Sequence, residues 1–232
     1  MLADYTNPWQ GRLLSDDFRD GEYLRNPAWT VVSGQFTVDR KGNFAGLRST
    51  IVPPGYVVGQ RQGGTTDNLA AAILNTFLNQ QVTTQQTAQY AAIHTPVKIS
   101  NSFAVRLEFA SGERFGRFDF GPYQGPSGVT AYRIAYLPGQ KDGLRLLRIT
   151  PRGSVAVGVY KGVLSLEDSR RHVIEWTRDR NGKMLVSLDG QDVIAANDKT
   201  ILKPFDGFMM INSGGSYWVR SITVDGSKAQ GL

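Results

Sequence analysis

Arginine and carboxylate side chains alternate with apolar residues in several segments of this sequence. A spacing of two places side chains on the same face of a β-strand, so these groups would line one face of a sheet. Guanidinium and carboxylate groups bind sugar hydroxyls, and the guanidinium fork also suits a sugar carboxylate. The simpler alternative is a solvated sheet face with cross-strand ion pairs. The candidate ligand-binding residues of this kind are Arg106, Glu108, Arg117, Asp119, Arg133 and Arg148.

Tyr123 adds an aromatic ring, on which the apolar face of a pyranose could pack. It lies in residues 121–126, a segment rich in Gly and Pro, which predicts a loop with an exposed ring. The alternative is a ring that caps the edge of the core. The other candidate platforms are Tyr132, Tyr136, Tyr160, Tyr217 and Trp218.

Metal and catalytic motifs are few. Asp16, Asp17, Asp20 and Glu22 form an acidic cluster, but without the fixed spacing of a calcium loop, so surface carboxylates are the simpler interpretation. The absence of cysteine excludes thiolate metal sites and thiol nucleophiles, and there are two histidines. No Gly-x-Ser-x-Gly elbow occurs. We therefore expect no catalytic residue, no metal site and no cofactor, with Ca²⁺ as the one alternative.

A period of two predicts the strands that position these side chains. In residues 103–109 the apolar side chains point to one face, and Arg106 and Glu108 point to the other. Asn181-Gly182 is the strongest hairpin signal, because both positions of a type I′ turn need positive φ. Many short strands separated by turns predict a β-sandwich or a barrel. Further strands are expected at residues 14–18, 34–38, 129–136, 144–150, 154–159, 172–178, 183–188, 207–211 and 217–224.

Residues 60–92 interrupt the β pattern and are predicted to be an insertion in a single sandwich that spans residues 1–232. Within them, residues 67–80 carry apolar side chains at Ala70, Leu74, Phe77 and Leu78, a spacing that predicts a short amphipathic helix. A stretch rich in Gln and Thr follows the helix. The apolar stripe would cover an edge or end of the sandwich. Alternatively, Leu74, Phe77 and Leu78 bind a partner chain.

The composition is that of a globular domain with a sizeable core. Of the 232 residues, 41% are hydrophobic and 20% are charged. The net charge of +6 favours acidic partners, but the basic residues are scattered rather than gathered in a stripe, so we expect no nucleic-acid binding. No segment approaches the ~18 apolar residues of a membrane span. The first residues lack the features of a signal peptide, so the protein is either cytoplasmic or its leader is not in this chain.

Several structural motifs resemble those of concanavalin A-like, laminarin-G-like domains. The motifs are Asp17-Phe18, residues 26–29, 34–38, 171–178, 182–186, 188–190, 204–207 and 218–224. The resemblance implies an all-β, two-sheet antiparallel jelly roll and an association with carbohydrate. It also implies that Trp29 and Trp176 are core residues, because they lie at the core positions of such domains. Relatives include glycan-binding modules, family 16 glycoside hydrolases and the domain of 3-keto-disaccharide hydrolases. The Glu-x-Asp-x-x-Glu strand of family 16 is missing, since Glu108, Glu113 and Asp119 do not have its spacing.

Three functions remain open from the sequence. The first is a non-catalytic recognition or assembly module with glycan as its ligand, located outside the cytoplasm. The second is a glycoside-processing hydrolase of the 3-keto-disaccharide type, with its site on the concave face. The third is an accessory subunit that docks on a larger complex, or on a second copy, through the helical insertion.

Overall fold

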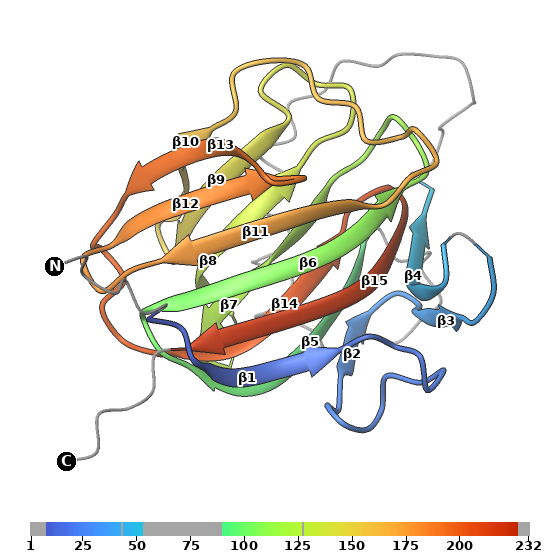
Figure 1. Cartoon of the computed structure of the whole chain (residues 1–232), viewed down its shortest axis with the longest axis horizontal. Helices are drawn as coiled ribbons and strands as arrows, with labels where there is room; N and C mark the ends of the chain where they lie inside the picture. The colour runs from blue at the N-terminus through green and yellow to red at the C-terminus, as the bar shows by residue number, and fades with distance from the viewer. Residues whose placement is uncertain (1–7, 43, 53–89, 127, 227–232) are drawn as a thin grey trace, which may run out of the picture.

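The strands of this protein pair into two antiparallel sheets that lie face to face (Figure 1). The computed structural model describes residues 8–42, 44–52, 90–126 and 128–226. These residues contain no helix, and so none that could span a membrane. The predicted all-β, two-sheet architecture is therefore confirmed. The helix expected at residues 67–80, with Leu74, Phe77 and Leu78, lies outside the described residues.

The eight-stranded sheet is in front in Figure 1, with β6, β11 and β15 crossing the view. Its strands follow the spatial order β13 (Gln191–Asn197), β12 (Lys183–Leu188), β11 (His172–Arg178), β6 (Phe103–Ser111), β15 (Gly215–Gly226), β4 (Gly46–Ile51) and β3 (Thr37–Asp39), and β1 (Gly11–Asp16) pairs with the second half of β15.

The seven-stranded sheet lies behind it. Its strands follow the order β10 (Gly153–Val159), β9 (Leu144–Thr150), β8 (Thr130–Tyr136), β7 (Phe118–Gln124), β14 (Phe205–Asn212), β5 (Ala91–Ile99) and β2 (Thr30–Ser33). Since β5 begins at Ala91, the predicted insertion cannot extend to residue 92: its last residues belong to the sheet.

The core lies between the sheets and is rich in aromatic rings. Trp176 meets Phe103 edge to face, with ring centroids 5.0 Å apart, and Phe118 stacks on Tyr217 at 4.8 Å. Burying each such side chain contributes roughly 1.5–3 kcal/mol to stability. Trp29 and Trp176 are 2% and 0% exposed, which confirms their assignment to the core.

Two hairpins show how turn residues set the register. Asp189 and Gly190 alone join β12 to β13, and both have positive φ (51° and 83°), as a type I′ turn requires. The hairpin predicted at Asn181-Gly182 is present, but only Gly182 has positive φ (78°). Its N–H donates to the carbonyl of Asp179 at 3.1 Å, so this connection is a four-residue turn rather than a type I′ turn.

Five strands were missing from the sequence prediction: β2, β4, β5, β7 and β13. In β5 and β7 the pattern is obscured by Pro96, Gly121 and Pro122, residues that are unfavourable inside strands. Both strands lie within the seven-stranded sheet, where pairing on two sides outweighs these local preferences.

Candidate functional site

The outer face of the seven-stranded sheet, which points away from the core, contains the candidate site. Three rows of side chains cross it. The first row runs through Ile149, Ala131, Tyr123 and Gly207; the second through Leu147, Arg133, Gly121, Met209 and His94; the third through Arg145, Ala135, Asp119, Ile211 and Ala92. The apolar members form a second buried cluster, separate from the core between the sheets.

The side chain of Tyr123, on β7, extends across Gly207 on the neighbouring strand β14. A Cβ atom on Gly207 would come within 2.4 Å of the Tyr123 hydroxyl oxygen, so the ring rests directly on the glycine. The hydroxyl reaches β5, where it shares a hydrogen bond of 2.8 Å with Nδ1 of His94. Burial lowers the pKa of His94, so the imidazole is neutral at pH 7, and its tautomer decides which of the two groups donates in this bond.

The side chain of Arg133, on β8, extends across β7 toward β14, as the side chain of Tyr123 extends across β14 toward β5. Gly121 is adjacent on β7 and is paired with Met209 on β14, so the arginine side chain passes over a position without a side chain. Its Nη2 lies 3.4 Å from the carbonyl oxygen of Gly128 and 3.6 Å from the sulfur of Met209. Burial lowers the pKa of Arg133 to about 10, although the charge of Asp119 opposes this shift.

Arg117 and Asp119 form a buried ion pair beside Arg133. Nε of Arg117 donates to both carboxylate oxygens of Asp119, at 2.8 and 2.9 Å, and each side chain is 5% exposed. Two buried guanidinium groups thus share one carboxylate on this face.

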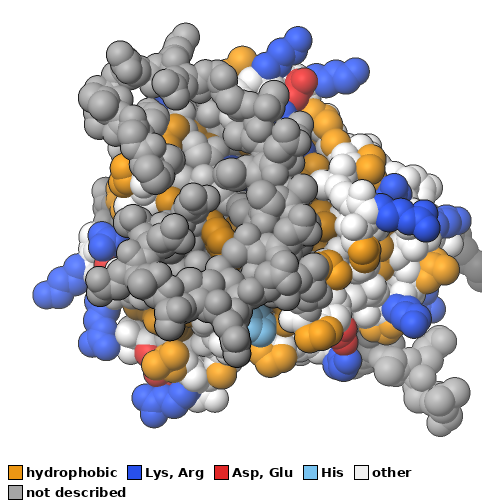
Figure 2. Space-filling model, turned by 180° about the vertical axis from the view of Figure 1, so that it is seen from behind, with side chains coloured by type: hydrophobic (Ala, Val, Ile, Leu, Met, Phe, Trp, Pro, Cys, Tyr) orange, Lys and Arg blue, Asp and Glu red, His pale blue; other side chains and the backbone are white. Residues whose placement is uncertain are grey.

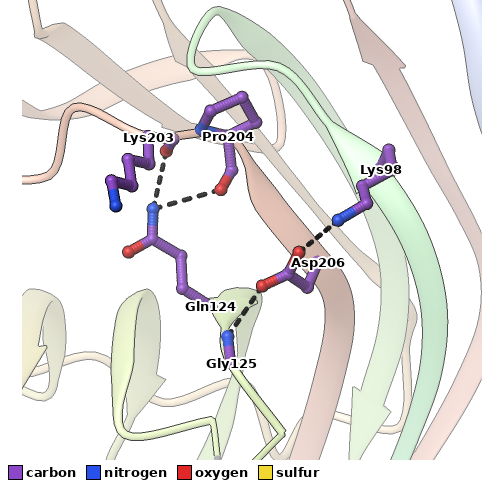
Figure 3. A pocket seen from close by; sticks show the side chains of 6 residues that line it. All are labelled: Lys98, Gln124, Gly125, Lys203, Pro204 and Asp206. Atoms are coloured by element: carbon purple, nitrogen blue, oxygen red, sulfur yellow. Dashed lines mark hydrogen bonds and ion pairs between the residues drawn. The ribbon is translucent and has the colours of Figure 1, made fainter.

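A pocket opens at the end of the outer face, where β5, β7 and β14 meet the loop before β14 (Figure 3). We call it the end pocket. Its volume is about 530 Å³, and its lining residues are Lys98, Gln124, Gly125, Lys203, Pro204 and Asp206. Since Gln124 and Gly125 directly follow Tyr123, the end pocket continues from the outer face.

Hydrogen bonds fix the polar groups of the end pocket. Nζ of Lys98 lies 2.5 Å from Oδ1 of Asp206, and the backbone N–H of Gly125 donates to Oδ2 at 2.7 Å. These two bonds, that to Lys98 first, lower the pKa of Asp206 and keep it ionised. The Gln124 amide donates to the carbonyl oxygens of Lys203 and Pro204 at 2.6 and 3.1 Å, leaving its own oxygen turned away (Figure 3).

The predicted ligand-binding residues do not all lie together. Arg106 and Glu108 are in β6 of the other sheet, where they approach Glu175 at 3.4 Å and Arg171 at 3.7 Å. Their inclusion in one surface with the other four was wrong, because β6 pairs with β11 and β15, not with β7. On that sheet the alternative of cross-strand ion pairs describes them better.

Arg148 is also separate from the outer face. It is paired with Tyr132, a core residue, and therefore points between the sheets. There it forms an ion pair with Asp198 and donates to Oγ1 of Thr200 at 2.7 Å. The structure thus brings together Arg117, Asp119, Tyr123 and Arg133 from the predicted set.

The prediction of an exposed ring at Tyr123 is wrong. Tyr123 is a strand residue of β7, not a loop residue, and it is 5% exposed. Tyr132, Tyr136 and Tyr217 are core residues, and Trp218 stacks on Phe44 over the eight-stranded sheet at 5.0 Å. In the described part of the chain, the large hydrophobic side chains that are well exposed are all aliphatic.

The aspartates of the acidic cluster accept hydrogen bonds, mostly from backbone N–H groups. Asp16 accepts hydrogen bonds from the indole of Trp29 and the N–H of Phe18, both at 2.8 Å. The side chains of Asp17 and Asp20 accept from backbone N–H groups two residues later. Among the described residues, no group of His, Asp and Glu side chains is arranged to hold a metal ion.

Sequence reasoning missed Lys98, His94 and Asp206. Lys98 and Asp206 are 108 positions apart in the chain, and no local motif links them. The available signal was the alternation Ala92, His94, Pro96, Lys98 in β5, which places polar groups on one face.

The sequence matches no protein-family model and no curated protein. Solved structures do resemble it. The carbohydrate-binding module CBM66 from Bacillus subtilis aligns with a TM-score of 0.58 and 10% identity, over 85% of this chain and 94% of that one. The carbohydrate recognition domain of Emp46p aligns with a TM-score of 0.58 and 11% identity, over 93% and 97%.

A family 16 endo-glucanase from Bacteroides ovatus aligns with a TM-score of 0.57 and 12% identity, over 91% of this chain and 99% of that one. At these identities the likeness concerns the fold. Together with the strand order above, it shows that the chain has the concanavalin A-like jelly-roll fold of lectin and glucanase domains.

Proposed function

We propose that this protein is a non-catalytic glycan-recognition module that binds its ligand in the end pocket, at the margin of the outer face. The observation that carries the proposal is the hydrogen-bonded arrangement of Lys98, Gln124, Gly125 and Asp206 around an open pocket of about 530 Å³. This volume is within the range of small-ligand sites. The shared fold with carbohydrate-binding proteins supports the same ligand class.

The chemistry of the end pocket fits a sugar. Asp206 supplies a charged acceptor and Lys98 a charged donor, and such hydrogen bonds are stronger than neutral ones. Pro204 is exposed and offers an apolar surface beside them. The groups are held by bonds to one another and to the backbone, so little ordering is needed when a ligand binds.

The hydrolase alternative has less support from the geometry. Asp119 and Asp206 are the carboxylates on the described strands of the outer face. They are far apart along the strand direction. Asp206 is level with Gln124, five residues along β7 from Asp119, or roughly 16 Å at the rise of a strand. The carboxylate pairs of glycosidases are about 5–9.5 Å apart.

A glycan array followed by calorimetry tests the proposal. The array identifies a ligand, whose affinity is then measured for the wild type, for Asp206→Asn and for Glu175→Gln. Asp206→Asn keeps the shape but removes the charged acceptor, so we expect the affinity to fall about tenfold, as for loss of a charged hydrogen bond of roughly 1.5 kcal/mol. Glu175 lies on the other sheet, and its variant should bind as the wild type does.

Two results would overturn the proposal. One is a wild-type protein that binds no glycan on the array. The other is a ligand that Asp206→Asn binds as tightly as the wild type. The accessory-subunit function, through Leu74, Phe77 and Leu78, stays a prediction. Size-exclusion chromatography with light scattering, with and without residues 60–89, would test it.

A further inference from the structure

Among the described residues of the outer face, the buried charges do not balance. Arg117 and Asp119 neutralise each other, which leaves Arg133 as a second buried cation. Within the described residues, no carboxylate oxygen lies within 4.0 Å of its guanidinium group, and Arg117 and Asp119 are the charged neighbours that act on it. Figure 2 shows this side of the molecule, where Lys and Arg side chains lie around the rim with a few Asp and Glu side chains among them.

Several N–H groups of the two arginines also lack acceptors. In the described part of the chain, Nε of Arg133 and Nη2 of Arg117 are buried without a hydrogen-bond partner. The contacts that Arg133 does make, to the Gly128 carbonyl at 3.4 Å and to the Met209 sulfur at 3.6 Å, are long and neutral. A buried guanidinium group without a partner is strongly unfavourable, and the usual compensation is an anion that accepts its hydrogen bonds.

We propose that Arg133 and Arg117 form a binding site for one monovalent anionic group of the size of a carboxylate. One negative charge neutralises the cluster of two guanidinium groups and Asp119. Its oxygens would accept from Nε of Arg133 and Nη2 of Arg117. The fixed charge of Asp119 disfavours a divalent anion, which would leave the buried cluster negative. Since Arg133 and Arg117 are 3% and 4% exposed, the occupant is a small group rather than a whole sugar ring.

Two sources supply this chemistry: a free anion, or the carboxylate of an acidic sugar held in the adjoining end pocket. The site itself goes beyond glycan recognition and does not depend on it. The acidic-sugar source rests on the proposed function. The experiments below treat the two sources separately.

Thermal unfolding tests the site. The wild type is unfolded in rising sodium acetate, at an ionic strength held constant with a bulky sulfonate salt. An anion that binds only the folded state raises the midpoint with the logarithm of its concentration, by about 5–10 °C at a hundredfold excess over its Kd. Arg133→Met keeps an unbranched apolar stem but removes the guanidinium group, and it should lose this dependence. Arg106→Met, on the other sheet, should keep it. Sulfate also stabilises proteins in general by its exclusion from their surface, so the part of the rise that Arg133→Met removes should be smaller with sodium sulfate than with acetate.

Crystals of the wild type soaked in bromide provide a measurement that does not need the variant to fold. A peak of anomalous density between Arg133 and Arg117 is expected. A wild-type midpoint that does not change with acetate, or one that changes equally in Arg133→Met, overturns the proposal, as does the absence of a bromide peak.

The source is decided with digalacturonate and its methyl ester, which differ in charge but not in the sugar ring. If digalacturonate binds, the ester does not, and acetate competes, the carboxylate of a sugar occupies the site. If acetate stabilises the protein but neither sugar binds, a free anion is the occupant. A protein that binds no glycan but still responds to acetate would refute the proposed function and leave the anion site intact.

Discussion

Replacing Gly207 by alanine tests whether Tyr123 is held by the glycine beneath it. The new Cβ atom would lie 2.4 Å from the phenolic oxygen and 2.5 Å from two ring carbons. The φ angle of Gly207 is not in the left-handed region, so the backbone accepts alanine and the cost comes from the ring. Tyr123 must move away and lose its 2.8 Å hydrogen bond with His94.

The magnitude follows from two terms. Overpacking at a buried contact costs about 1–3 kcal/mol, and a lost hydrogen bond costs about 1 kcal/mol. We therefore expect Gly207→Ala to lower the free energy of unfolding by about 2–4 kcal/mol in the wild type. With Tyr123→Ala already present, the space is open, and Gly207→Ala should be neutral or stabilise by about 0.5–1 kcal/mol, because alanine loses less backbone entropy than glycine.

Urea unfolding of the four proteins in this double-mutant cycle gives the coupling energy. Tyr123→Phe keeps the ring but removes the hydroxyl, and in this background Gly207→Ala should remain costly. An equal effect of Gly207→Ala in all backgrounds would refute the arrangement, since it would place the cost in the backbone rather than in the ring.

Two further predictions concern buried carboxylates. Burial raises the pKa of Asp16 from 3.8 to about 6, despite its hydrogen bond from Trp29. The folded state therefore holds more protons than the unfolded state between about pH 4 and pH 6, so the unfolding free energy should fall as the pH rises through this window. Asp16→Asn should remove this pH dependence in urea titrations at a series of pH values. An unchanged pH dependence would assign it to other groups. Asp198 accepts a hydrogen bond from the hydroxyl of Tyr132 at 2.6 Å and forms an ion pair with Arg148. Asp198→Ala leaves both partners unsatisfied and should lower the free energy of unfolding by about 3 kcal/mol. A loss below 1 kcal/mol in urea unfolding would contradict this assignment.

The proposed glycan site and the proposed anion site use different parts of one face. The end pocket lies at the end of β7, and the arginine cluster lies at the start of β7 and the middle of β8. Tyr123 separates them, because its ring lies beside Gly128, whose carbonyl faces Arg133. A change at Tyr123 is therefore expected to affect both sites, whereas Asp206→Asn and Arg133→Met should each affect one.

The sequence by itself determined the fold class and the core. Alternation along residues 103–109 identified a strand and the face that it buries. The turn residues marked where hairpins occur. Each of these features is local, because side-chain direction and turn geometry depend on a few neighbouring residues.

Only the tertiary structure decided which polar residues share a surface. A period of two assigns a side chain to one face of its strand, but it does not say which strand is the neighbour or to which sheet the strand belongs. For that reason Arg106 and Arg133, equivalent in the sequence pattern, lie on opposite sheets. The same holds for Tyr123, whose burial depends on Gly207 and His94, and for Asp206, which meets Lys98 through pairing of β14 with β5.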